Sequence, residues 1–185
     1  MRDGHLLEAA VKLSEAMNKV ADHHLPEKLA GMVKLHSGLA VGSVLIPIPG
    51  ADVAAAAANI WTMYARINGE LNLPFSENVI KSVAAGVATN IGGAAAGLLV
   101  LGTAAKLFPG IGSVGGAALM AGTIYGITIV SGIVYMRAVA ALLRRKSAAQ
   151  VSETDLKAAT EEIMRDKDKI KEMVKEERAG YRPTT

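Results

Sequence analysis

The sequence predicts an all-α protein built from two apolar, Gly/Ala-rich helical hairpins, each bent at a Pro-Gly turn, with amphipathic helices at both ends. Charged residues are grouped in blocks, which leaves two long uncharged runs, Ser82–Ala105 and Leu107–Met136. The chain has 19 glycines but only seven aromatic residues, a composition that favours closely packed helices over a core of large side chains. A Pro-Gly pair also recurs sixty residues apart, at Pro49-Gly50 and Pro109-Gly110.

Residues 1–36 are predicted to form amphipathic helices. Apolar residues from Leu6 to Ala21 recur at spacings of three and four, the period of one helical face. Pro26 marks a break and favours the first turn of a second helix, which we expect to continue toward Ile46.

The first hairpin is predicted to turn where two prolines remove backbone donors and disfavour helical geometry. The turn residues are Pro47, Pro49 and Gly50. A new helix is expected from about Ala51 to Asn68, with Asp52 in its first turn near unpaired N–H groups. A loop follows as far as Pro74, and Ser76 is expected to cap the next helix.

The second hairpin joins a helix over 77–106 to a helix over 113–146. Its turn is predicted at Phe108–Gly112, with Pro109, Gly110 and Gly112 as the turn residues. An uncharged run of 24 residues spans roughly 36 Å as a helix, enough to cross a hydrocarbon core of about 30 Å. We therefore interpret 37–146 as an apolar membrane core.

Residues 147–185 are predicted to form a charged, solvated helix and tail. The helix is expected from Ser152 to about Arg178, and Ser152 with Asp155 has the spacing of a capping box. The basic run Arg144–Lys146 follows the last apolar segment, which by the positive-inside tendency predicts a cytoplasmic C-terminal end. The prediction is a protein of the cytoplasmic membrane with both termini cytoplasmic.

Small residues spaced as G-x-x-x-G occur four times in the apolar segments. In an apolar helix this spacing makes a flat face against which another helix can pack, so it predicts close helix packing and a homo-oligomer. The predicted packing residues are Gly38, Gly42, Gly93, Gly97, Gly112, Gly116, Gly122 and Gly126.

A polar face is predicted on the helix that begins near Ala51. Asp52, Asn59 and Arg66 are seven residues apart and so share one face, and Asn90 on the following helix is a fourth candidate. Ionisable groups at membrane depth are candidates for a polar path. The structural alternative is that Asp52 caps a turn, Arg66 lies at an interface and Asn59 makes one interhelical hydrogen bond.

The residue types exclude several classes of chemistry. There is no Cys, and the histidines His5, His23, His24 and His36 lack any metal-ligand spacing. No nucleophile, acid–base or phosphate-binding motif is present. Basic residues of the tail alternate with acidic ones, which argues against nucleic-acid binding. We predict no catalytic residue, no metal site and no cofactor.

Several short motifs resemble a bacterial family known as a domain of unknown function. They are Ile46–Asp52, Met63, Pro74-Phe75-Ser76 and Phe108–Gly112, within residues 30–145. That domain often follows a Ras-like GTPase domain and is regarded as membrane-associated, so the resemblance implies apolar hairpins and a separate GTPase as a partner. One departure is Ile60, where the family tends to carry glutamine; here Asn59 lies one place earlier.

The predicted function is a non-enzymatic module that contacts the lipid bilayer, self-associates, and has a structural or membrane-remodelling role with a GTPase partner. One alternative is an oligomeric pore or ion channel built from Gly-packed hairpins. Another is a soluble helical oligomer that acts as an interaction scaffold, because Ala and Gly contribute little insertion free energy compared with Leu, Ile or Phe.

Overall fold

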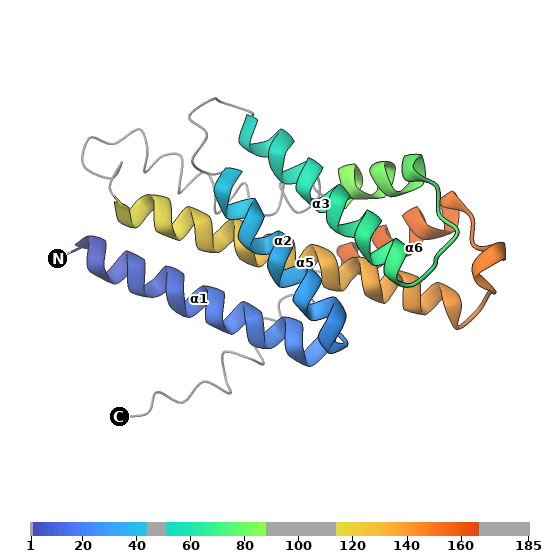
Figure 1. Cartoon of the computed structure of the whole chain (residues 1–185), viewed down its shortest axis with the longest axis horizontal. Helices are drawn as coiled ribbons and strands as arrows, with labels where there is room; N and C mark the ends of the chain where they lie inside the picture. Colours follow the sequence, from blue (N-terminus) through green and yellow to red (C-terminus); the bar gives the residue numbers. More distant parts are fainter. Residues whose placement is uncertain (1, 44–50, 88–113, 167–185) are drawn as a thin grey trace.

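The computed structural model describes residues 2–43, 51–87 and 114–166, and within these ranges every regular element is a helix (Figure 1). The prediction of an all-α chain is confirmed for this part of the chain. The predicted turn residues Pro47, Pro49, Gly50, Pro109, Gly110 and Gly112 lie outside the described residues, so the two Pro-Gly hairpins stay predictions. The helical elements are α1 Arg2–His24, α2 Glu27–Ser43, α3 Ala51–Glu70, a helix over 77–87, α5 Val114–Leu143, the 3-10 turn η1 Ala148–Gln150 and α6 Glu153–Arg165.

The predicted break between the first two helices is found at Pro26. The N–H of Leu25 still donates to the carbonyl of Ala21 at 3.0 Å, and the carbonyl of Pro26 accepts from Ala30 at 2.9 Å. Proline has no N–H to continue the first helix, but its fixed φ suits the start of the second. The chain therefore reverses here, and α2 folds back from the end of α1.

The loop after α3 is built by asparagines, and the predicted cap of the next helix follows it. Asn72 adopts a left-handed φ of 49°, which asparagine tolerates better than most residues. The Asn68 side chain donates to the carbonyl of Phe75 at 3.2 Å. Ser76 then caps the 77–87 helix, its hydroxyl accepting from the N–H of Val79 at 3.4 Å.

The longest helix, α5, lies at the centre of the described bundle. Helices α1, α2, α3 and α6 all pack against it, and Figure 1 shows α1 running beside it in the same direction. The buried core includes Met17 from α1, Ile133 from α5 and Leu156 from α6. The three predicted segments 1–36, 37–146 and 147–185 thus share one core in the described residues.

The charged C-terminal helix differs from its prediction in length and in packing. Helix α6 ends at Arg165, so it does not run uninterrupted to Arg178, and residues 167–185 lie outside the described part. It is also not simply solvated, because Leu156 and Thr160 are buried against the bundle. Its apolar stripe therefore covers neighbouring helices, while its charges remain on the outer face.

Candidate functional site

A polar clamp joins α2 to α3; it consists of His36, Asn59 and Arg66. His36 is buried, with 2% of its surface exposed. Its Nδ1 lies 3.0 Å from Asn59 Oδ1, and Asn59 Nδ2 donates to the His36 carbonyl at 2.7 Å. Arg66 Nη1 lies 3.5 Å from His36 Nε2. The buried imidazole of His36 thus contacts both of the residues that α3 contributes to the polar clamp.

The hydrogen bonds of the polar clamp select one tautomer of His36. Since Asn59 uses its NH₂ group to donate to a carbonyl, its Oδ1 is the acceptor for His36 Nδ1–H. A neutral imidazole protonated on Nδ1 has a lone pair on Nε2, and that lone pair can accept from the Arg66 guanidinium. All three side chains are satisfied together, so the polar clamp links α2 and α3 at little desolvation cost.

The predicted polar face is thereby assembled in part. Asn59 and Arg66 meet at the polar clamp, as the interhelical reading of Asn59 expected. Asp52 lies in the first turn of α3, as predicted, but its side chain is outside the described part, as is Asn90. The sequence prediction missed His36 as a partner. The signal was its spacing from Val33 and Ala40, which places a histidine on the buried face of α2.

Replacing Asn59 by leucine tests the polar clamp. The change leaves the His36 Nδ1–H and the His36 carbonyl without their partner, and we expect the free energy of unfolding to fall by about 1–3 kcal/mol. Chemical denaturation measures this value. Thr62→Ala is the matched control on α3, because Thr62 is exposed and bonds only its own helix. Equal effects of the two substitutions would contradict the polar clamp.

A second buried contact joins α3 to α5. Tyr64 and Tyr135 stack with ring centroids 4.1 Å apart and planes 13° from parallel. The Tyr64 hydroxyl donates to the Ser131 carbonyl at 3.0 Å and lies 2.7 Å from the Ser131 hydroxyl. Both rings are fully buried, so they act as core residues that hold α3 against α5.

The G-x-x-x-G pairs have different environments. A Cβ on Gly122 would lie 3.3 Å from the Ala10 carbonyl oxygen, and one on Gly126 would lie 3.3 Å from Met17 Cγ. This pair therefore lies where α5 packs against α1. By contrast, a Cβ built on Gly38 or Gly42 would have no described atom of another helix within 4 Å. Gly116 lies in α5, but its surroundings, like the pair Gly93 and Gly97, lie outside the described part.

The tightest approach of two helices occurs at Gly132, which the spacing analysis missed. A Cβ there would lie 2.6 Å from Val33 Cγ2, a distance that no real side chain tolerates. Gly132 therefore leaves room for the Val33 side chain where α2 packs against α5. No G-x-x-x-G pair includes it, so the pattern gave no signal.

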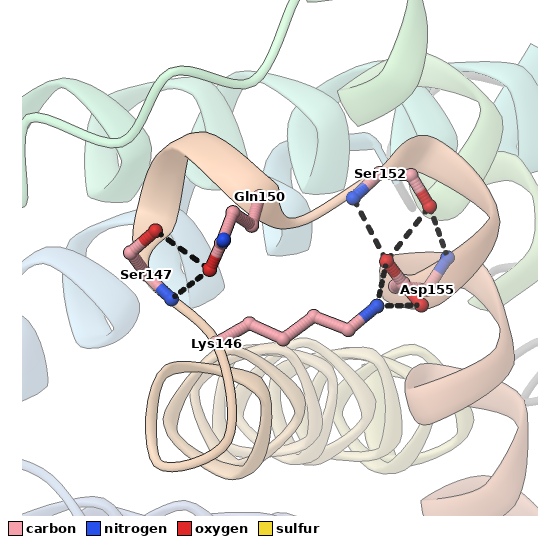
Figure 2. A network of polar contacts seen from close by, with 5 residues as sticks. All are labelled: Lys146, Ser147, Gln150, Ser152 and Asp155. Atoms are coloured by element: carbon pink, nitrogen blue, oxygen red, sulfur yellow. Dashed lines mark hydrogen bonds and ion pairs between the residues drawn. The ribbon is translucent and has the colours of Figure 1, made fainter.

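A polar network fastens the start of α6 to the end of α5 (Figure 2). Both carboxylate oxygens of Asp155 accept from Lys146 Nζ at 2.9 Å, and Oδ2 also accepts from the N–H and hydroxyl of Ser152. The Ser152 hydroxyl in turn accepts from the Asp155 N–H at 3.1 Å. The predicted capping box is thus confirmed. Beside it, Gln150 accepts from Ser147.

The network predicts an acid-sensitive contribution to stability. The hydrogen bond from Lys146, followed by those from Ser152, lowers the pKa of Asp155 from 3.8 to about 2. A lowered pKa in the folded state stabilises the fold above the unfolded value, and this contribution disappears between pH 3.8 and about 2. Asp155→Asn should therefore lower the thermal midpoint at neutral pH, with a difference that vanishes near pH 2. A constant difference would contradict this assignment.

Helix α5 contains a segment long and apolar enough to cross a membrane. The segment is Ile124–Leu143, 20 residues, of which Arg137 is the charged member, and 56% of its most apolar 18-residue stretch is buried inside the protein. At about 1.5 Å per residue it spans roughly 30 Å. Among the described residues, no three His, Asp or Glu side chains lie together in a way that could hold a metal ion.

The comparisons with known proteins add one similarity. Magnetosome membrane protein 22 of Magnetospirillum gryphiswaldense is 35% identical to this chain over 81 residues, which is 44% of this chain and 42% of that protein. The chain thus matches less than half the length of this curated relative. No family model and no solved structure matches the chain.

Proposed function

We propose that the protein is a membrane-associated helical module with a structural role and no catalytic one. The observation that carries this proposal is the α5 segment Ile124–Leu143, whose length equals the thickness of a hydrocarbon core. The partial similarity to a magnetosome membrane protein supports the same assignment. Arg144, Arg145 and Lys146 follow the segment directly and favour a cytoplasmic position for its C-terminal end.

A lysine in the middle of this segment tests the proposal. Val130 is only partly buried, so Val130→Lys can place its ammonium at the bundle surface. In a bilayer the same lysine should cost about 2.5–3.5 kcal/mol of insertion free energy. We expect the membrane-bound fraction to fall steeply while circular dichroism stays helical. The control is Ala149→Lys, outside the segment and exposed. Equal membrane binding by both variants would contradict the assignment.

Self-association is the second part of the proposal. The exposed face of α2 carries Leu35 and Leu39 beside Gly38 and Gly42, and no described atom of another helix would lie within 4 Å of a Cβ on either glycine. A second copy could approach such a face closely. Gly38→Leu should then reduce chemical crosslinking between copies in membranes, whereas Ala58→Leu on the exposed surface of α3 should not. A separate GTPase as partner rests on the sequence resemblance and is tested by affinity capture with purified candidate GTPases.

The pore alternative receives no support from the described residues. Of the four candidates for a polar path, Asn59 and Arg66 both contact His36 in the polar clamp, and the side chains of Asp52 and Asn90 lie outside the described part. Side chains occupied in this way hold two helices together and do not line an open route. Ion flux from the purified protein in liposomes remains the measurement that would favour a pore.

A further inference from the structure

Helix α1 lies along the N-terminal part of the α5 segment in a defined register. Ala10 is opposite Gly122, and Met17 is opposite Gly126. The Tyr125 hydroxyl donates to Asn18 Oδ1 at 2.5 Å. Near the end of α1, Arg137 Nη2 lies 3.2 Å from His24 Nδ1. The two helices are therefore parallel, and the stretch from Met17 to His24 accompanies Gly126 to Arg137 of α5.

In this register, charged side chains of α1 lie alongside the apolar segment of α5. Lys19 and Asp22 lie in the part of α1 that accompanies α5, and both are exposed on its outer face. Asp22 pairs with Lys34 of α2 at 2.5 Å. If the segment Ile124–Leu143 crossed a bilayer with α1 in place, these charges would lie at hydrocarbon depth. Charged side chains are rare and costly there, particularly when they face lipid.

The C-terminal half of α5 has a similar cover. Helix α6 packs on it through the buried Leu156, and its outer face carries Glu153, Lys157 and Arg165. Over half of the most apolar stretch of the α5 segment is buried in the described bundle, so lipid cannot reach that surface while both covers remain. The charged outer faces of α1 and α6 therefore favour contact with water, whereas the apolar composition of the central helix α5 favours contact with lipid.

We infer that the described bundle is the closed form of the protein and that α1 separates from α5 before α5 crosses a bilayer. This inference rests on the proposed membrane function and adds the conformational change that it requires. Two glycines and two polar pairs set the register of α1 on α5, and α1 also buries Met17, Val20 and Ala21 in the shared core, so the lipid that α5 then contacts must replace these apolar contacts when α1 separates. Helix α1 then acts as an autoinhibitory cover whose removal exposes the Gly122–Gly126 face.

A disulfide between the two helices tests the inference directly. The chain has no cysteine, so Met17→Cys with Gly126→Cys introduces the only two thiols. A Cβ on residue 126 would lie 3.3 Å from the present Met17 Cγ, within reach of a disulfide. A second pair, Ala10→Cys with Gly122→Cys, lies about two helical turns away on α1. It replaces the first pair if that pair disturbs folding.

Each pair is mixed with vesicles of phosphatidylcholine and phosphatidylglycerol in oxidised and reduced form. Carbonate-resistant insertion is measured after flotation, with each single-cysteine variant under the same oxidant as control. We expect the oxidised pairs to insert about tenfold less or worse, with full recovery after reduction. Equal insertion of both forms would overturn the inference and leave the proposed function standing. Failure of the reduced pairs and of the unmodified chain to insert would overturn both. Failure of both pairs to crosslink would contradict the helix register and overturn the inference alone.

Discussion

Gly132→Ala should lower the free energy of unfolding by about 1–3 kcal/mol, the usual cost of overpacking a well-packed core. The added methyl carbon would lie 2.6 Å from Val33 Cγ2 and 2.9 Å from Val33 Cγ1. Val33 is fully buried, so it cannot move into solvent, and α2 must shift away from α5. Denaturant unfolding followed by circular dichroism measures the change.

The matched control is Gly38→Ala on the opposite side of α2. The methyl group added there would have no described atom of another helix within 4 Å. Alanine is also the better helix former by about 1 kcal/mol, so this variant should gain stability. The double variant Val33→Ala with Gly132→Ala should show favourable coupling, because the smaller side chain makes room for the new methyl group. Stabilisation by Gly132→Ala alone would show that the helices do not cross this closely.

Leu156→Ala should lower the free energy of unfolding by about 2–5 kcal/mol, the range for truncating a fully buried leucine. Leu156 is the α6 residue in the shared core, so its truncation should first weaken the packing of α6 against the bundle. Amide hydrogen exchange should then show faster exchange over Glu153–Arg165 than over α5.

Leu39→Ala is the control for this truncation, since Leu39 is 58% exposed and loses little buried area. Its effect on stability should stay below about 1 kcal/mol. If Leu156→Ala were equally mild, α6 would not belong to the core, and the C-terminal segment would be the solvated appendage that its charge pattern predicts.

Local signals in the sequence were sufficient for several elements. The break at Pro26, the cap at Ser76 and the capping box of Ser152 with Asp155 each depend on residues within a few positions of one another. Helix α5 was predicted over 113–146 and occupies Val114–Leu143, because its long apolar run has no competing structure.

Features that depend on a distant partner were harder to predict. His36 was considered only as a metal ligand, because its partners Asn59 and Arg66 are on another helix. The spacing of Gly38 and Gly42 equals that of Gly122 and Gly126, yet among the described residues the second pair meets a neighbouring helix and the first does not. Spacing shows that a flat face exists, whereas the position of a neighbour decides whether it is used.

The length of α6 illustrates a related limit. Charge pairs such as Glu161 with Arg165 favour a solvated helix, and that pair lies 3.8 Å apart on the surface. The same pattern gives little information on which apolar side chains find a groove. Leu156 and Thr160 are buried because the 77–87 helix and α5 lie beside them, which only the three-dimensional arrangement reveals.

The central claim is that this protein associates with membranes through α5, and alkaline carbonate extraction of membranes from cells that express the unmodified chain tests it most directly. We expect the protein to sediment with the membranes and to resist extraction, because an inserted apolar helix is not released by high pH. A protein that remains in the soluble fraction as a defined oligomer, under every lipid composition tried, would contradict it. Helix α5 would then be the core helix of a water-soluble bundle, and the exposed α2 face would be a contact between copies.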